Sequence, residues 1–306
     1  MLKGNSVVSI SDIGKDEMLE LFKLADSYSR SIEQGQRIDS LHGSIMATFF
    51  YEPSTRTRLS FESAMHRLGG SVISVSEAKS SSVAKGETLA DTVRMAASYS
   101  DIIVIRHPMD GAAKLARKFS SKPIINAGDG SGQHPTQTLL DLYTIRKELS
   151  DIDGKEITML GDLRYGRTVH SLLLALSEFD VKINLVSPPL LRVPQHILDQ
   201  VQSMVKIRVT ENLNDVISDS DVLYVTRIQK ERFTDETEYN SVIGSYIVNS
   251  DIVSTMKKNS IVMHPLPRVN EISPEVDADP RAAYFRQAAN GIPVRMALLS
   301  MILGGK

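Results

Sequence analysis

Short runs of β-branched and other apolar residues alternate with segments of helical periodicity along most of the chain. The runs expected to be strands are 45–50, 72–75, 101–106, 123–126, 157–160, 181–186, 206–209, 221–226 and 260–263. Helical patterns between them cover 59–68, 136–147 and 168–179. Because such alternation is typical of parallel strands with helices on both faces of the sheet, the chain is predicted to be an α/β protein.

A polar turn near the middle of the chain, Asp151-Ile-Asp-Gly154, interrupts this alternation, which then restarts. The 306 residues of the chain are enough for about two domains. We therefore expect two domains, residues 1–149 and 150–306, each built on a parallel sheet covered by helices on both faces. A last amphipathic helix is expected over about 291–304, and its pattern does not tell which domain it packs on.

The composition excludes several classes of protein. The chain has no cysteine, which rules out disulfides, a cysteine nucleophile and every cysteine-ligated metal site. Its formal net charge of -2 provides no basic field for nucleic acid or an anionic membrane. No stretch approaches the ~18 apolar residues of a transmembrane helix, and the first residues lack the apolar core of a signal peptide. We therefore expect a soluble protein of the cytoplasm.

Basic and polar side chains follow the predicted strands. In an open parallel sheet, ligands bind beyond the carboxyl ends of the strands. Of the six segments that follow predicted strands, five contain arginine and one contains histidine and glutamine. The arginines are Arg56, Arg58, Arg106, Arg164, Arg167, Arg227 and Arg268, and the remaining segment carries His134 and Gln137. A site surrounded by this many cations favours an anionic ligand.

The segment Ser54-Thr55-Arg56-Thr57 lies between a predicted strand and a predicted helix. Backbone N–H groups at a helix N-terminus attract anions. Three hydroxyls and a guanidinium add further donors, so the segment is interpreted as a phosphate seat. The alternative is an ordinary N-cap with a solvated arginine, but a cap needs only one hydroxyl.

The glycine-rich stretch 128–132 precedes His134 but does not match a dinucleotide fingerprint, because Gln133 stands where the pattern G-x-G-x-x-G requires its last glycine. The chain has no P-loop pattern either. His134 and Gln137 share one helix face and could donate to a carbonyl oxygen. A histidine bonded to nearby backbone remains an alternative for His134, and salt bridges remain one for Arg167 and Arg227. No second histidine lies at metal-ligand spacing, and His264 is interpreted as structural.

Taken together, these motifs resemble the catalytic chains of the aspartate carbamoyltransferase family over roughly residues 44–303. The stretches that carry the resemblance are 54–62 (STRTRLSFE), 85–91 (KGETLAD), 106–108 (RHP), 126–131 (NAGDGS), 133–142 (QHPTQTLLDL), 161–162 (GD), 165–171 (YGRTVHS), Arg227 with 229–232 (QKER), and 264–268 (HPLPR). The resemblance implies transfer of the carbamoyl group of carbamoyl phosphate to the α-amino group of L-aspartate, an early step of pyrimidine synthesis.

The resemblance also implies roles for individual residues. Ser54, Thr55, Arg56 and Thr57 would hold the phosphate, and Arg106, His134 and Thr55 would polarise the carbamoyl carbonyl. Gln137 and the backbone carbonyls of Leu266 and Pro267 would bind the carbamoyl amino group. Arg167, Arg227 and Gln229 would bind the aspartate carboxylates. Residues 1–149 would form the carbamoyl phosphate domain, with the last helix packed back on it, and residues 150–306 would form the aspartate domain.

Further implications concern assembly and domain closure. The family forms homotrimers in which Ser81 and Lys85 reach into the site of a neighbouring subunit, although Lys85 by its pattern alone is a solvated loop residue. No metal and no organic cofactor are implied. Closure of the two domains would be stabilised by Glu52 with Arg167, and by Arg232 with the loop near Tyr239. A zinc-bearing regulatory chain is a possible partner, because the segment 109–115 resembles the region where such a chain docks.

Two competing interpretations remain. Ornithine carbamoyltransferases share the phosphate seat and the carbonyl donors, but that family usually carries a cysteine-containing loop near its C-terminal end. Its cationic substrate would also favour acidic residues where this chain has Arg227-Ile-Gln229. The second alternative is a non-catalytic homologue that keeps the fold and binds anions. It is disfavoured because every motif position is filled.

Overall fold

A computed structural model describes residues 2–75, 86–233 and 235–305 of the chain. The chain divides into two compact units, one formed by Met1–Leu140 with Asn290–Lys306 and the other by Asp141–Ala289. The division falls within helix α5 (Pro135–Leu149), earlier than the boundary at 149/150 suggested by the sequence. Helix α10 (Tyr284–Leu303) also contributes residues to both units.

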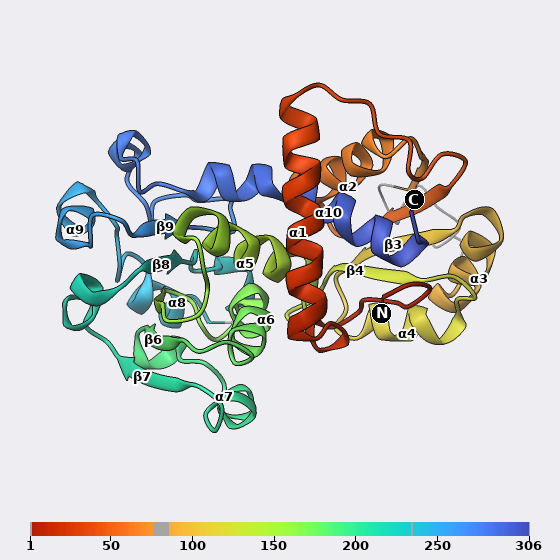
Figure 1. The fold of residues 1–306 in the computed structure, drawn as a ribbon. Helices are drawn as coiled ribbons and strands as arrows, with labels where there is room; N and C mark the ends of the chain where they lie inside the picture. Colours follow the sequence, from red (N-terminus) through yellow and green to blue (C-terminus); the bar gives the residue numbers. More distant parts are fainter. Residues whose placement is uncertain (1, 76–85, 234, 306) are drawn as a thin grey trace. The chain divides into compact units, whose positions relative to one another are not determined.

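The first unit is built on a parallel sheet with the strand order β2-β1-β3-β4. Its strands are β1 (Ile45–Phe50), β2 (Ser71–Val75), β3 (Ile102–His107) and β4 (Ile124–Asp129). Its other helices are α1 (Lys15–Glu33), α2 (Thr55–Arg67), α3 (Leu89–Tyr99) and α4 (Ala112–Phe119). Figure 1 shows α3 and α4 at one side of this sheet and α1 at the other.

Small side chains allow helices to pack closely on this sheet. Ala96 and Ala97 of α3 and Ala116 of α4 are buried in one cluster with Ala47 and Ile103 of the strands. The strand residues that alternate with these, such as Met46 and Val104, are fully buried as well. Since successive residues of a strand point to opposite faces, both faces of the sheet are covered.

The second unit is built on a parallel sheet with the order β7-β6-β5-β8-β9. Its strands are β5 (Glu156–Leu160), β6 (Lys182–Val186), β7 (Lys206–Thr210), β8 (Val222–Val225) and β9 (Ile261–Met263). Its helices are α6 (Arg167–Leu176), α7 (Gln195–Val201), α8 (Glu236–Val242) and α9 (Ser250–Thr255). Short 3-10 turns connect several of these elements.

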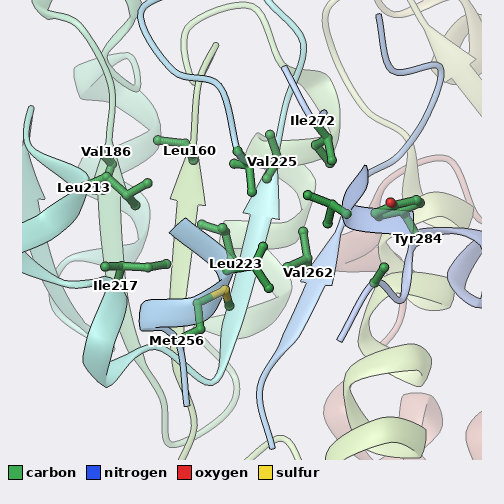
Figure 2. Packing of buried hydrophobic residues seen from close by; sticks show 14 of the residues in the cluster. Leu160, Val186, Leu213, Ile217, Leu223, Val225, Met256, Val262, Ile272 and Tyr284 are labelled. Atoms are coloured by element: carbon green, nitrogen blue, oxygen red, sulfur yellow. The ribbon is translucent and has the colours of Figure 1, made fainter. Parts of the chain in front are cut away.

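A buried apolar cluster lies against this second sheet. Figure 2 shows Leu223 and Val225 of β8 and Val262 of β9 within the same cluster as Met256 and Tyr284. Residues of α6 such as Leu172 and Leu173 are also fully buried. The predicted fold class, an α/β chain with two parallel sheets covered by helices, is confirmed.

The C-terminal helix is longer than expected. The amphipathic pattern predicted a helix over about 291–304, but α10 begins at Tyr284 and contains Pro293. Its C-terminal part contacts the first unit, where Ser300 Oγ lies 2.8 Å from Tyr28 Oη of α1 and Arg295 donates to Ser60 Oγ at 2.9 Å. In the described part of the chain, no helix is both long and apolar enough to cross a membrane.

Candidate active site

The N-terminus of α2 is open toward solvent in the first unit. Ser54 occupies the N-cap position in an extended conformation, but its side chain makes no capping hydrogen bond. Thr55 and Arg56 are exposed and Thr57 is buried. The first turn contains no acidic residue. The Ser54 hydroxyl and the first N–H groups of the helix are therefore arranged as expected for an anion site rather than for a closed cap.

Arg106 lies beside this segment because of the strand register. β1 and β3 are paired with Phe50 opposite Arg106, and the N–H of Tyr51 donates to the Arg106 carbonyl at 2.9 Å. The Arg106 side chain is 11% exposed, and its guanidinium donates to Glu52 Oε1 at 3.0 Å and to the carbonyl of Ala127 at 3.4 Å. These contacts fix the plane of the guanidinium. Within the first unit, Glu52 thus interacts with Arg106.

The glycine-rich stretch 128–132, which begins in the last residues of β4, leads into a tight turn. Gly128 and Gly130 have φ values of 114° and 48°, which favour glycine. A side chain at Gly130 would also lie 1.7 Å from a carboxylate oxygen of Asp110. The Asp129 carboxylate accepts from the N–H of Gln133 at 3.1 Å. This confirms that the glycines serve to turn the backbone before His134.

His134 directly precedes α5 and Gln137 lies in its first turn, at the same sheet edge. His134 is 4% exposed, and its carbonyl accepts from the N–H of Gln137 at 3.0 Å. Gln137 is half-buried. Since β1, β3 and β4 are neighbours in the sheet, the segment 54–57, Arg106 and His134 all lie at the edge formed by the carboxyl ends of these strands.

In the second unit, Asp162 organises the loops that follow β5 and β8. It is fully buried, and its Oδ1 accepts from the N–H groups of Tyr165 at 2.9 Å and Arg164 at 3.2 Å. Burial raises the pKa of Asp162, and hydrogen bonds from the backbone of Tyr165, Gln229 and Arg164 together with the Arg232 charge oppose this. The backbone carbonyl of Asp162 also accepts from Thr226 Oγ1 at 3.3 Å, so Asp162 connects the loop before Arg167 with the residue that precedes Arg227.

The expected aspartate ligands lie after these two neighbouring strands. Arg167 is the first residue of α6, while Arg227 and Gln229 follow β8, and all three side chains are half-buried. Gly161 precedes Asp162 with φ 112°, and a side chain there would lie 2.4 Å from the Thr226 carbonyl. Only glycine allows β5 and β8 to approach in this way.

Leu266 and Pro267 follow β9, the next strand of the same sheet. Their peptide bond is cis, and Leu266 has φ 57°. Farther along the β8 loop, the ring of Phe233 lies 5.7 Å from Tyr165 and 5.5 Å from Tyr239. The segment near Tyr239 therefore packs through Phe233 on the loop that precedes Arg167.

Two predicted site residues, Ser81 and Lys85, lie outside the described residues. Sequence reasoning assigned no role to Asp162 or Glu271, which are buried carboxylates with several backbone partners. The signals for Asp162 were its position directly after a strand and a glycine, and its place in the stretch 161–162 that carries the family resemblance. Among the residues that the structure describes, no group of three or more histidine or acidic side chains is arranged to hold a metal ion.

Two family models match the chain. Residues 5–147 match the model described as "Aspartate/ornithine carbamoyltransferase, carbamoyl-P binding domain". Residues 153–302 match the model described as "Aspartate/ornithine carbamoyltransferase, Asp/Orn binding domain". Together they cover nearly the whole chain.

Similar proteins agree with these models. The aspartate carbamoyltransferase catalytic subunit of Thermoplasma acidophilum is 67% identical over 304 residues, which are 99% of this chain and 100% of that protein. The solved catalytic subunit of M. jannaschii aspartate transcarbamoylase has a TM-score of 0.90 at 55% identity, covering 97% of both chains. Aspartate transcarbamoylase from Trypanosoma cruzi, solved with carbamoyl phosphate and aspartate, has a TM-score of 0.95 at 46% identity, covering 99% of this chain and 98% of that chain.

Proposed function

Because this chain belongs to the aspartate/ornithine carbamoyltransferase family, we propose that it transfers the carbamoyl group of carbamoyl phosphate to L-aspartate. The products are N-carbamoyl-L-aspartate and phosphate, and the reaction serves pyrimidine synthesis in the cytoplasm. Aspartate rather than ornithine is the acceptor, since the relatives reported above are aspartate carbamoyltransferases at up to 67% identity. The arginines after β5 and β8 also suit a dicarboxylate better than an ammonium group.

The open N-terminus of α2 is the observation that carries this proposal. Ser54, Thr55, Arg56 and Thr57 hold the phosphate, with the helix N–H groups and hydroxyls as donors. The Ser54 side chain makes no capping bond, so binding an anion does not require that such a bond be broken.

Arg106, His134 and Thr55 polarise the carbamoyl carbonyl. Negative charge develops on this oxygen as the amine attacks, and donors that are already oriented stabilise the transition state more than the substrate. Arg106 is suited to this role because Glu52 and the Ala127 carbonyl fix its guanidinium. Gln137 and the carbonyls of Leu266 and Pro267 bind the carbamoyl amino group.

Arg167, Arg227 and Gln229 bind the carboxylates of aspartate. The buried Asp162 supports this assignment, because its carboxylate binds the loop before Arg167 and its carbonyl binds Thr226, the residue before Arg227. The chain supplies no nucleophile. Holding the aspartate amine next to the carbonyl, together with neutralising the leaving phosphate, provides the rate enhancement.

Domain closure completes the site in this proposal, with Glu52 pairing with Arg167 and Arg232 holding the loop near Tyr239. Replacing Glu52 by alanine is expected to raise the KM for aspartate and to lower turnover. An unchanged KM and turnover in that variant would refute the pairing.

The proposed assembly is a homotrimer in which Ser81 and Lys85 of one subunit complete the site of its neighbour. A zinc-bearing regulatory chain is proposed to dock near residues 109–115, where Met109 and Leu115 are 67% and 43% exposed. Size-exclusion chromatography of the chain alone and with such a partner tests both statements.

Phosphate release by the purified chain tests the function directly. Carbamoyl phosphate is supplied with L-aspartate or, in parallel, with L-ornithine. Release with aspartate alone is the expected result. Release with ornithine would keep the phosphate seat but refute the assignment of Arg227 and Gln229. No release with either would favour a non-catalytic homologue, which a carbamoyl phosphate binding measurement would identify.

A further inference from the structure

A buried histidine–glutamate pair closes the loop that carries Leu266 and Pro267. His264 Nε2 lies 2.7 Å from Glu271 Oε1, and the two side chains are 1% and 8% exposed. The other ring nitrogen, Nδ1, accepts a hydrogen bond from the N–H of Leu266 at 2.7 Å. Because Nδ1 is an acceptor, the ring proton is on Nε2, which donates to the Glu271 carboxylate.

Glu271 also holds the far side of the loop. Its Oε2 accepts from the N–H groups of Val269 and Asn270, both at 3.1 Å. Burial raises the pKa of Glu271, and hydrogen bonds from His264 and from the backbone act in the opposite direction. One carboxylate therefore connects both ends of the loop.

The base of the loop is fixed as well. The N–H of His264 donates to Gln287 Oε1 at 2.9 Å, and Gln287 Nε2 donates to Asp141 Oδ1 at 2.6 Å. Leu266 has φ 57°, a left-handed conformation that is an outlier for a bulky residue. Such a conformation persists only where its surroundings determine it, and here the His264 ring holds the Leu266 N–H.

We propose that His264 and Glu271 are positioning residues that orient the carbonyls of Leu266 and Pro267 toward the amino group of carbamoyl phosphate. The pair acts through the backbone, since the ring binds the Leu266 N–H and the carboxylate binds the ring. The inference rests on the proposed function, in which these carbonyls bind the carbamoyl amino group. The phosphate seat at α2 has its own donors and does not depend on the pair.

Comparing the affinities for two ligands distinguishes a positioning role of the pair from a general effect on the stability of the protein. Carbamoyl phosphate carries the amino group that the carbonyls bind, and inorganic phosphate does not. In Glu271→Gln, a single amide oxygen cannot accept from both the His264 ring and the two backbone N–H groups, so the carbonyls move. We expect kcat/KM and the affinity for carbamoyl phosphate to fall ~10²-fold, as for other small misplacements of substrate-binding groups, with an unchanged Kd for phosphate.

Two substitutions of His264 test whether the contact between its Nδ1 and the Leu266 N–H is the one that matters. In His264→Asn, the amide oxygen can replace Nδ1 as acceptor for the Leu266 N–H. In His264→Gln, the amide lies nearer the position of Nε2 and that acceptor is lost. We expect His264→Asn to retain more carbamoyl phosphate affinity than His264→Gln. The control is Ser220→Ala, which removes a buried hydrogen bond to Thr158 Oγ1 at 2.5 Å in the same unit and should leave both affinities unchanged.

Equal losses of affinity for both ligands in folded Glu271→Gln, or no loss for either, would overturn the inference. If Glu271→Gln does not fold, equal carbamoyl phosphate affinities in the two His264 variants would overturn it instead. Failure of the unaltered chain to bind carbamoyl phosphate more tightly than phosphate, or to carbamoylate aspartate, would refute the proposed function and the inference with it. Failure of the inference and failure of the proposed function can be told apart, because the first is measured on the Glu271 and His264 variants and the second on the unaltered chain.

Discussion

The guanidinium of Arg106 is held in place by the protein itself. Glu52 and the Ala127 carbonyl accept its hydrogen bonds at 3.0 and 3.4 Å. A donor oriented in this way toward developing charge contributes ~10²–10³ in turnover. We therefore expect Arg106→Ala, and likewise His134→Ala, to lose about that factor in kcat while carbamoyl phosphate still binds at the α2 seat.

Steady-state kinetics and carbamoyl phosphate binding check this expectation. Arg117→Ala is a matched control, because Arg117 forms an exposed ion pair with Asp12 at 3.1 Å in the same unit. This control should show nearly normal turnover. Nearly normal turnover in Arg106→Ala or His134→Ala would show that the role assigned to that residue is wrong.

Gly161 is required for a close approach of two backbones. A side chain at this position would meet the Thr226 carbonyl at 2.4 Å and would also need φ 112°. Gly154 has φ 78° with no atom within 4 Å of an added side chain. Gly154→Ala should therefore cost only about 1–2 kcal/mol of unfolding free energy for the left-handed backbone, and Gly161→Ala clearly more. Urea unfolding of both variants measures this, and equal losses would refute the steric argument.

At the scale of elements, the N-termini of α2 and α9 differ in whether a side chain caps the helix. The Ser54 side chain makes no capping bond at α2, whereas Asn249 Oδ1 accepts from the N–H of Ile252 at 3.0 Å at α9. Asn249→Ala should lower the unfolding free energy by about 1 kcal/mol. Ser54→Ala should leave it nearly unchanged but weaken phosphate binding. The opposite pattern, measured by urea unfolding and phosphate titration, would identify Ser54 as a structural cap.

Strands were easier to predict than helices because their sequences are distinctive. Fully buried parallel strands require continuous apolar runs, so the predicted run 45–50 coincides with β1. Helix α10 was predicted to be too short, because its first turns, including the buried Tyr284, pack in the second unit before Pro293 is reached. A proline within a helix looks like a helix start when only local preferences are considered.

Candidate site residues could be proposed from the sequence where a side chain follows a strand and itself suits the ligand. Arg106 and His134 are of this kind, and the neighbouring strands β1, β3 and β4 explain why they share a sheet edge. Asp162 and Glu271 could not be predicted in the same way. They act through hydrogen bonds from the backbone, and such contacts leave no regular spacing in the sequence.

At the scale of the whole chain, acid should destabilise the second unit by protonating two neighbouring carboxylates, Asp277 and Asp279. Hydrogen bonds from Arg268 and Arg281 lower the pKa of Asp277 and Asp279, respectively. A carboxylate with a lowered pKa stabilises the folded state above its usual pKa, and this stability is lost as the pH falls through the lowered value. The unfolding free energy should therefore drop between about pH 4 and pH 2. Asp162 opposes this trend because burial raises its pKa.

Asp277→Asn should flatten this drop, because asparagine does not titrate, and should lower stability at pH 7 by removing the ion pair with Arg268. Urea unfolding at pH 7, 4 and 3 measures both effects. Asp199→Asn is the control, since Asp199 accepts hydrogen bonds from the neutral Gln195 and Gln202. If Asp277→Asn showed the same pH dependence as the unaltered chain, the ion pair would not be a source of the acid sensitivity.

The proposed sharing of sites between subunits has a consequence that no single chain can show. Arg106→Ala removes a group from a subunit's own site, while Lys85→Ala removes a group offered to a neighbour. In randomly mixed trimers of the two variants, a site is intact when its own chain carries Lys85→Ala and its neighbour carries Arg106→Ala. About a quarter of the sites meet this condition in an equimolar mixture of a cyclic assembly. We expect the reassembled mixture to regain about that share of normal turnover, although each variant alone is nearly inactive. Activity no greater than the mean of the two variants would show that each site is formed by one chain.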